Sequence, residues 1–328
     1  MRTIEVIGVH AGGEVGNVVV AGVEPPPGAT VREQMEALRA DDGLRRFLLR
    51  EPRGSVATHA NLIVPATRDD CAYGYIIMEP TEYPLMSGSN TICVATVLLE
   101  TGMVSMQEPE TVVRLEAPAG VVEVRAACRN GRVESVELTN VPAHATRLDA
   151  SLEVEGIGAI TVDVAFGGMW YAIADATQLG FEIAAGEARE LCAVGERIRV
   201  AAKEQLDGNV SIVQIAQPWQ GVGAVSRNAV VIAPGRLDRS ATGTGLSARM
   251  AALHARGLMR VGDTMTHASP IGSTFDGRIV AETADGKIIP AIRGSGFVTG
   301  RYELYVDPRD PFPEGYLVSD TWPGSDRQ

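Results

Sequence analysis

The chain has 328 residues, of which 45% are hydrophobic and 21% are charged, and its formal net charge is −12. This composition is typical of a globular protein with room for two domains, and the negative charge disfavours nucleic acid as a partner. With no apolar stretch near the length of a membrane span, no signal-peptide core and no C-x-x-C spacing among its four cysteines, the chain is expected to be cytoplasmic, with reduced thiols and no membrane partner.

Short runs of β-forming residues dominate both halves of the chain. We predict strands at 4–9, 17–23, 61–65, 73–79, 111–116, 121–127 and 133–138, and then at 159–164, 170–175, 211–215, 228–233, 277–282, 288–292 and 296–305. Helical spacing predicts amphipathic helices at 31–49 and 187–204, whereas 91–100 and 246–255 are apolar on nearly all sides, as buried helices are. Many strands and few helices predict an α+β fold, with a sheet wrapped around a buried central helix in each half.

The starts of the two apolar helices repeat one pattern. Ser87-Gly88-Ser89-Asn90 precedes a run that closes at Gly102, and Thr242-Gly243-Thr244-Gly245 precedes a run that closes at Gly257. Both ends are offset by the same number (242 − 87 = 155 and 257 − 102 = 155). This repeat predicts two pseudo-symmetric lobes with an active site in the cleft between them.

The proline- and glycine-rich stretch 142–158 is the expected crossover between the lobes. We therefore expect an N-terminal lobe at 1–145 and a C-terminal lobe at 146–304. The tail at 305–328, acidic and proline-rich at its start, is expected to return to the first lobe.

A glycine-rich helix start suits the binding of a small anion. Its backbone N–H groups lack helical partners and carry positive partial charge, and glycine lets a carboxylate approach closely. Two such starts on one carboxylate would place Ser87 and Thr242 on opposite sides of the neighbouring carbon. For either hydroxyl alone an ordinary helix N-cap is the better interpretation, but the repeated spacing favours the functional one. A phosphate loop at Gly243-x-Gly245 is a weak alternative, because no lysine follows.

The segments around both hydroxyls read Met86-Ser87-Gly88-Ser89-Asn90-Thr91-Ile92 and Asp238-Arg239-Ser240-Ala241-Thr242-Gly243-Thr244-Gly245. With Gly12-Gly13-Glu14, Glu51-Pro52-Arg53-Gly54, Ala165-Phe166-Gly167-Gly168 and the segment 307–315, they resemble the proline racemase superfamily nearly end to end. The resemblance implies the fold of diaminopimelate epimerase: two similar α+β lobes around one site, with no metal and no cofactor.

The departures from that family are informative. Proline racemases and typical 4-hydroxyproline epimerases carry cysteine at the positions of Ser87 and Thr242, and an alcohol is far harder to deprotonate than a thiol. Threonine at the second position resembles the trans-3-hydroxy-L-proline dehydratases, which need only one base because the 3-hydroxyl leaves. Serine at the first position resembles dehydratases with some 4-hydroxyproline epimerase activity. Ser89-Asn90 also replaces the His-Gly of the racemases.

Carried over to this chain, the resemblance implies that Ser87 removes the α-proton and that Thr242 faces the departing hydroxyl. It implies that Asp238 accepts a hydrogen bond from the ring ammonium. The further substrate-binding residues are expected to be Gly88, Ser89, Asn90, Gly243, Thr244 and His59. Cys93 is expected to be inert packing, and the five histidines show no metal-ligand spacing.

The sequence therefore predicts dehydration of trans-3-hydroxy-L-proline to Δ1-pyrroline-2-carboxylate, a step of hydroxyproline catabolism. One alternative is a 4-hydroxyproline 2-epimerase, as the main or as a second activity of the same site. Another is a catalytically weak protein that binds proline analogues, since both thiols are missing. The expected partner is a small imino acid, and the sequence leaves a homodimer open.

Overall fold

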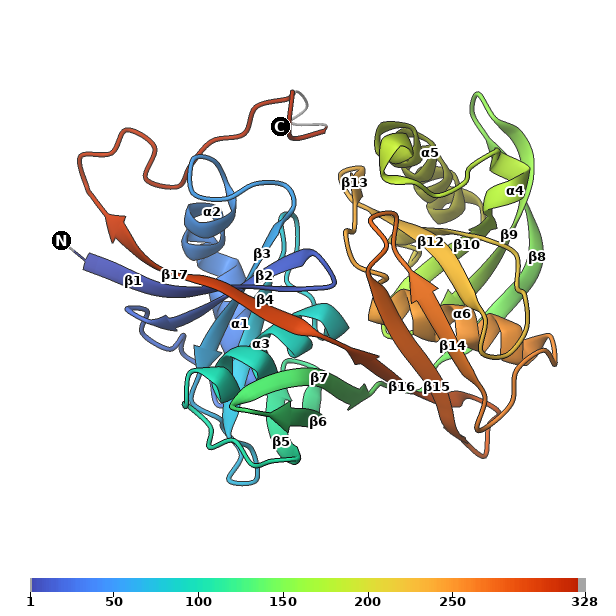
Figure 1. The fold of residues 1–328 in the computed structure, drawn as a ribbon. Helices are drawn as coiled ribbons and strands as arrows, with labels where there is room; N and C mark the ends of the chain where they lie inside the picture. The colour runs from blue at the N-terminus through green and yellow to red at the C-terminus, as the bar shows by residue number, and fades with distance from the viewer. Residues whose placement is uncertain (1, 324–328) are drawn as a thin grey trace. The chain divides into compact units, whose positions relative to one another are not determined.

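The computed structural model describes residues 2–323, which form a mixed α+β fold of two compact units (Figure 1). The first unit runs to Leu138 and resumes at Gly294, and the second is Thr139–Arg293. These bounds differ from the expected divisions after 145 and 304. The reason is strand pairing: β8 (His144–Val154) pairs with β9 (Gly158–Phe166) in the second unit, and β17 (Gly296–Val306) pairs with β1 (Arg2–Ala11) in the first.

The strands of the first unit pair in the order β17–β1–β2–β3–β4–β5–β6–β7. The pairs β2/β3 and β4/β5 are parallel and the others are antiparallel. The remaining bounds are β2 (Glu14–Ala21), β3 (Thr58–Val64), β4 (Tyr73–Met78), β5 (Glu110–Ala117), β6 (Gly120–Arg129) and β7 (Arg132–Thr139).

The second unit repeats this pairing pattern as β8–β9–β10–β11–β12–β14–β15–β16, again with its third and fifth pairs parallel. The short β13 (Arg236–Leu237) is added at the end of β12. The other bounds are β10 (Trp170–Asp175), β11 (Ile212–Ala216), β12 (Val225–Ile232), β14 (Thr264–Ala268), β15 (Thr274–Glu282) and β16 (Ile288–Gly294).

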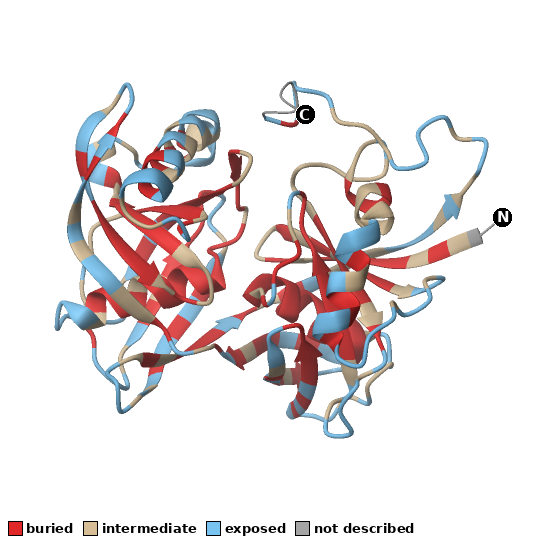
Figure 2. Cartoon of the chain, turned by 180° about the vertical axis from the view of Figure 1, so that it is seen from behind, coloured by how far each residue is buried: buried red, intermediate tan, exposed pale blue. Residues whose placement is uncertain are grey.

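Each unit places one apolar helix against its strands. In the first, α3 (Gly88–Glu100) is buried from Gly88 to Leu99 and packs on β1, β2, β3, β6 and β17. In the second, α6 (Gly243–Ala255) packs on β8, β9, β10 and β15. Figure 2 shows how burial concentrates along these elements. A helix that is buried on all sides needs apolar residues around its whole circumference, which is the pattern that the sequence carries.

The strands under these helices are apolar at successive positions because both of their faces are covered. Along β10, Tyr171 and Ile173 join the core beside α6, whereas Ala172 and Ala174 join a second core beneath α5 (Ala188–Gln205). Successive strand residues point to opposite faces, so alternation between two cores removes the usual apolar–polar pattern. The second unit also contains α4 (Ala176–Leu179) and a 3₁₀ turn at Ala185–Glu187.

The helix predicted at 31–49 is two helices, α1 (Val31–Asp41) and α2 (Gly43–Leu49). Asp42 lies between them in the left-handed region with φ 56°, and such a residue ends an α-helix. The apolar spacing continues through the break, so periodicity alone did not reveal it. Thr30 caps α1 by accepting from the Glu33 amide, and the Glu33 carboxylate accepts from Ala29 N at 2.7 Å.

Sequence reasoning missed three strands: β8, the two-residue β13 and β14. β8 lies within the stretch predicted as a crossover; many of its residues are exposed, and its pairing with β9 is interrupted by register shifts near Ala145 and Arg147. β14 has only five residues. After β17 the chain lies on the first unit, where Tyr316 N donates to Glu51 O and Arg53 pairs with Asp310 at 3.0 Å. Within residues 2–323, no helix is both long and apolar enough to span a membrane.

Candidate active site

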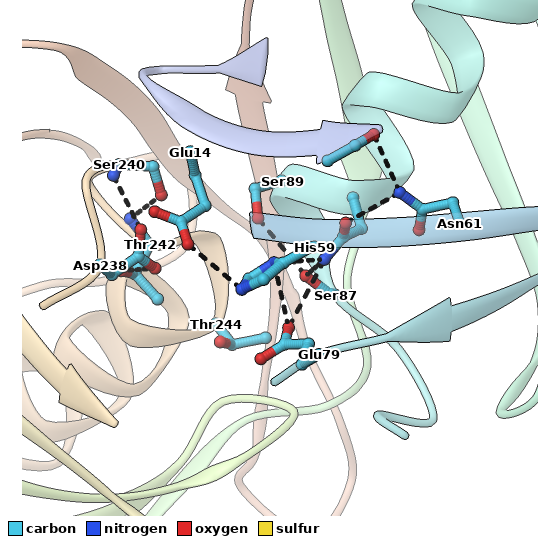
Figure 3. Close-up of polar contacts among 12 residues, drawn as sticks. Glu14, His59, Asn61, Glu79, Ser87, Ser89, Asp238, Ser240, Thr242 and Thr244 are labelled. Carbon is cyan, nitrogen blue, oxygen red and sulfur yellow. Dashed lines mark hydrogen bonds and ion pairs between the residues drawn. The ribbon is translucent and has the colours of Figure 1, made fainter. Parts of the chain in front are cut away.

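Ser87 lies at the start of α3 but does not cap the helix with its side chain. It occupies the N-cap position with φ −149° and ψ 127°, and its hydroxyl makes no capping hydrogen bond. Instead, Ser87 Oγ accepts a hydrogen bond from Asn90 Nδ2 at 3.0 Å and lies 3.4 Å from Ser89 Oγ (Figure 3). The residue is half-buried. The ordinary N-cap interpretation therefore does not describe this serine.

The backbone of Ser87 is held in place from within the helix. Its carbonyl accepts hydrogen bonds from Thr91 N at 2.9 Å and from Thr91 Oγ1 at 2.7 Å. The Tyr75 hydroxyl lies 2.6 Å from Thr91 Oγ1. Burial raises the pKa of Tyr75 to about 12, so this hydroxyl stays protonated at neutral pH. The position of the Ser87 hydroxyl is thus defined by hydrogen bonds to the Ser87 carbonyl and to the Ser87 side-chain oxygen.

Beside the first turn of α3 lies a group of polar side chains, Glu14, His59, Asn61, Glu79 and Asn90, which we call the buried cluster (Figure 3). Each is at most 7% exposed. His59 Nε2 lies 3.2 Å from Glu14 Oε1, and His59 Nδ1 lies 3.2 Å from Asn90 Nδ2 and 3.5 Å from Glu79 Oε1. Asn61 Nδ2 donates to Asn90 Oδ1 at 2.9 Å. The cluster reaches Ser87 through the Asn90 amide.

Thr242 precedes α6 and likewise makes no capping hydrogen bond. Its Oγ1 donates to Asp238 Oδ2 at 2.7 Å, while Asp238 Oδ1 accepts from Ser240 N at 2.7 Å. Thr242 has φ 57° and ψ 105°, a region that a β-branched residue occupies only at a cost on the order of 1–2 kcal/mol. A strained residue whose hydroxyl is engaged by a buried carboxylate is typical of a functional position.

The first turn of α6 is packed tightly against the loop after β9. A Cβ on Gly167 would lie 2.2 Å from the Thr244 carbonyl oxygen, so only glycine allows this approach. The Tyr171 hydroxyl lies 2.7 Å from Thr244 Oγ1, and Asn140 Nδ2 donates to Gly167 O and to Ser247 Oγ. These contacts fix the backbone at Gly243 and Thr244, the first two residues of the helix.

The two helix starts differ at their third residue. Asn90 is the third residue of α3, and Gly245 holds the corresponding place in α6. A Cβ on Gly245 would lie 3.0 Å from Gln214 Nε2, so a neutral amide fills the space beside it. The side-chain amide that donates to Ser87 therefore has no counterpart on α6. Thr242 has a carboxylate partner instead.

A family model described as proline racemase matches residues 6–317. The chain belongs to the proline racemase family. A probable proline racemase from Agrobacterium radiobacter, solved with bound carbonate, is 40% identical with a TM-score of 0.90, covering 97% of this chain and 98% of that one. A hydroxyproline epimerase from Agrobacterium vitis, solved with bound trans-4-hydroxy-L-proline, is 38% identical with a TM-score of 0.91, covering 100% and 99%.

More distant structures share only the fold. A PhzF-family phenazine biosynthesis protein from Bacillus anthracis is 11% identical with a TM-score of 0.64, covering 93% of this chain and 100% of that one. A predicted epimerase from Pseudomonas aeruginosa is 15% identical with a TM-score of 0.60, covering 93% and 100%. The α+β fold of the diaminopimelate-epimerase type, expected from the motifs, is thereby confirmed.

The residues expected to bind substrate fall into two groups in the structure of this racemase-family chain. Gly88, Ser89, Gly243 and Thr244 open the two helices, and Asp238 lies in the loop before α6. His59 and Asn90 are members of the buried cluster and are 2% and 1% exposed; Ser89, Asp238 and Thr244 are also buried, at 8%, 4% and 7% exposed.

Sequence reasoning missed Glu14, Asn61 and Glu79. Glu14 lies in a quoted motif, but no role was assigned to it. A usable signal was the presence of acids and amides inside otherwise apolar strand patterns, because buried carboxylates need partners.

The remaining histidines and thiols lie elsewhere in the structure. His267 on β14 is fully buried; burial, followed by the nearby Arg249 guanidinium, lowers its pKa to about 3. His10 Nδ1 accepts from Gly13 N at 3.2 Å. Cys93 is fully buried in α3, and burial raises the pKa of its thiol well above its usual range. In the part of the chain that the structure describes, no group of three or more His, Cys, Asp or Glu side chains is arranged to hold a metal.

Proposed function

We propose that the chain is a cytoplasmic, cofactor-independent hydro-lyase that converts trans-3-hydroxy-L-proline into Δ1-pyrroline-2-carboxylate. The observation that carries this proposal is the unequal chemistry of the two helix starts. Ser87 receives a hydrogen bond from an amide, which suits a base, whereas the Thr242 hydroxyl is bonded to the Asp238 carboxylate, a group that could return a proton to Thr242 after Thr242 assists a leaving hydroxyl. A racemase needs matched proton carriers on two faces, whereas a dehydratase needs one base.

The proposed reaction begins at the α-carbon. Ser87 reacts as its alkoxide, its hydroxyl proton having passed to water before the reaction; it takes the α-proton, and the charge spreads onto the substrate carboxylate. The backbone N–H groups of Gly88, Ser89, Gly243 and Thr244 would bind this carboxylate, which requires both helix starts to face the same substrate. Helix starts stabilise developing negative charge through aligned N–H groups.

The C3–O bond then breaks, and the leaving oxygen needs one proton to depart as water. Thr242 supplies it and is reprotonated from Asp238, which takes a proton from the ring ammonium. The Thr242–Asp238 hydrogen bond supplies the contact that this relay needs, with the two oxygens 2.7 Å apart. Its direction reverses once Asp238 is protonated: Asp238 then donates to Thr242, and the threonine proton is free for the leaving oxygen. The products are water and a neutral enamine, with the α-proton on Ser87. Ser87 then releases the α-proton to water, which restores its alkoxide, and the released enamine tautomerises to Δ1-pyrroline-2-carboxylate.

A second candidate is 4-hydroxyproline 2-epimerase activity, either alone or beside dehydration. The observation that favours it is the 38% identity to a hydroxyproline epimerase solved with trans-4-hydroxy-L-proline. Here the intermediate would be reprotonated on the opposite face, where Thr242 is a weaker acid than the cysteine of a typical epimerase.

Two incubations distinguish these functions. With trans-3-hydroxy-L-proline we expect the loss of about one water per substrate, which mass spectrometry would detect as a product about 18 mass units lighter than the substrate. With trans-4-hydroxy-L-proline in D2O, an inverted and α-deuterated product would establish the epimerase instead. If neither substrate reacts while pyrrole-2-carboxylate binds tightly in calorimetry, the chain is a binding protein and both catalytic assignments fail.

Alkylation of the thiols is expected to leave turnover intact. Typical members of the family use two cysteines at the positions of Ser87 and Thr242, so iodoacetamide should inactivate them. In this chain Cys93 is fully buried, with its pKa raised by burial, while Cys71 and Cys192 are only partly buried. Mass spectrometry of the native protein should therefore find Cys71 modified before Cys93, with little change in rate. Inactivation in step with Cys93 labelling would contradict this assignment.

A further inference from the structure

We infer that Asn90 is the positioning residue of Ser87: its amide donates to the serine oxygen, and the buried cluster holds that amide in the donating orientation. The inference rests on the proposed role of Ser87 as the base, and it supplies the group that makes an alcohol usable in that role. An alkoxide is stabilised by a donated hydrogen bond, and hydrogen bonds to charged groups are about twice as strong as neutral ones.

The orientation of Asn90 follows from its neighbours. Asn61 Nδ2 lies 3.1 Å from Gly16 O and 3.5 Å from Asn17 O, and carbonyl oxygens accept only, so this atom is the Asn61 amide nitrogen. The same nitrogen lies 2.9 Å from the Asn90 side chain, whose facing atom must therefore be the acceptor Oδ1. The Asn90 amide nitrogen is thereby directed to the opposite side, toward Ser87 and His59.

The two protons of Asn90 Nδ2 then have identifiable acceptors. Ser87 Oγ lies at 3.0 Å and His59 Nδ1 at 3.2 Å, while Glu79 Oε1 lies at the longer distance of 3.5 Å. If His59 Nδ1 accepts, the ring carries its proton on Nε2 and donates it to Glu14 Oε1 at 3.2 Å. A chain of donors thus runs from Asn61 through Asn90 to Ser87, and in that tautomer of His59 a branch runs from Asn90 through His59 to Glu14.

The fold itself does not require an amide at this position of the helix. α6 starts in the same way in the second unit and carries Gly245 there, with the Gln214 amide from β11 in the space beside it and no amide on the helix itself. Asn90 is also 1% exposed, so water cannot readily replace the hydrogen bond that it donates, and the surrounding low dielectric strengthens it. Asn90 therefore serves the chemistry of Ser87 in addition to filling space.

The test compares two substitutions of Asn90 across pH. N90A removes the donor, and we expect kcat to fall about 10- to 100-fold at every pH, with KM changed less than about threefold. N90D keeps the shape but presents a carboxylate to Ser87; we expect a loss of about 100-fold or more at about pH 8, partly recovered as the pH falls and the new carboxyl becomes a donor. T96V, which removes a buried hydroxyl bonded to Ile92 O in the same helix, is the control and should keep the wild-type profile.

A second pair of variants tests the support of Asn90. H59Q retains an atom that can accept from the Asn90 amide, so it should keep more activity than H59L at equal thermal stability. The proposal is overturned if N90D shows the wild-type kcat at about pH 8, if N90A and N90D lose activity by one factor at all pH values, or if the losses are confined to KM. Those results would assign Asn90 a structural or substrate-binding role.

The outcome is separable from that of the proposed reaction. If the wild-type protein epimerises 4-hydroxyproline and does not dehydrate the 3-isomer, the dehydratase proposal fails. The activity of the same variants is then measured as α-deuterium incorporation. The expected order of their activities is unchanged, because Ser87 remains the base. If the wild-type protein turns over neither substrate, the role of Ser87 fails and the inference fails with it.

Discussion

Replacing Ser87 with alanine is expected to lower kcat for trans-3-hydroxy-L-proline by about 10²- to 10⁴-fold, the range that a general base contributes. The hydroxyl is the one group of its turn that is half-buried, free of a capping bond and supplied with an amide donor. Alanine removes only the oxygen and leaves the helix start with its N–H groups, so substrate binding should weaken much less than turnover. Initial rates measured at saturating and at low substrate concentrations separate the effect on turnover from the effect on binding.

Two further variants make the Ser87 result interpretable. S87C supplies a more acidic group at the same place and should retain dehydration, because a thiolate forms more readily than an alkoxide. T101A removes a hydroxyl at the opposite end of α3, where it bonds to Val97 O, and should leave the rate unchanged. Undiminished dehydration by S87A would show that another group takes the α-proton.

Much of the fold could be predicted because its determinants are local or repeated. The apolar runs of α3 and α6 identified the two buried helices, and the constant offset between their starts predicted a duplication. The break at Asp42 could not be found in this way, since a single left-handed residue leaves the apolar spacing unchanged. β8 was missed because an exposed, irregularly paired edge strand has neither an apolar run nor a strict alternation.

The site was predictable only where its residues adjoin in sequence. Ser87 and Thr242 stand directly before glycine-rich helices, and Asp238 lies four residues before Thr242, so one motif contains both partners of the 2.7 Å hydrogen bond. The buried cluster is assembled from β2, β3, the end of β4 and α3. Its members are far apart in the sequence, and only the pairing of those strands brings Glu14 to His59. No spacing rule describes such a group.

Thr242→Cys is expected to raise the rate of inversion at the α-carbon, a reaction that the wild-type protein should carry out poorly. A thiol has a pKa of about 8.5 and gives up a proton far more readily than an alcohol, so the face opposite Ser87 would gain an effective proton donor. The position tolerates the change, since cysteine lacks the β-branch that makes φ 57° costly for threonine. The change also removes the hydroxyl that, in the proposed dehydration, relays a proton from Asp238 to the leaving group.

The measurement is incubation with trans-4-hydroxy-L-proline in D2O, followed by chiral chromatography and mass spectrometry. We expect T242C to raise the rate of inverted, α-deuterated product on the order of 10²-fold over wild type, the range of a well-placed general acid. Dehydration of trans-3-hydroxy-L-proline should fall at the same time by about tenfold. T242S keeps a hydroxyl beside Asp238 and should gain no inversion. If T242C leaves the stereochemistry of the product unchanged, residue 242 does not face the α-carbon and the division of roles between the two helix starts is wrong.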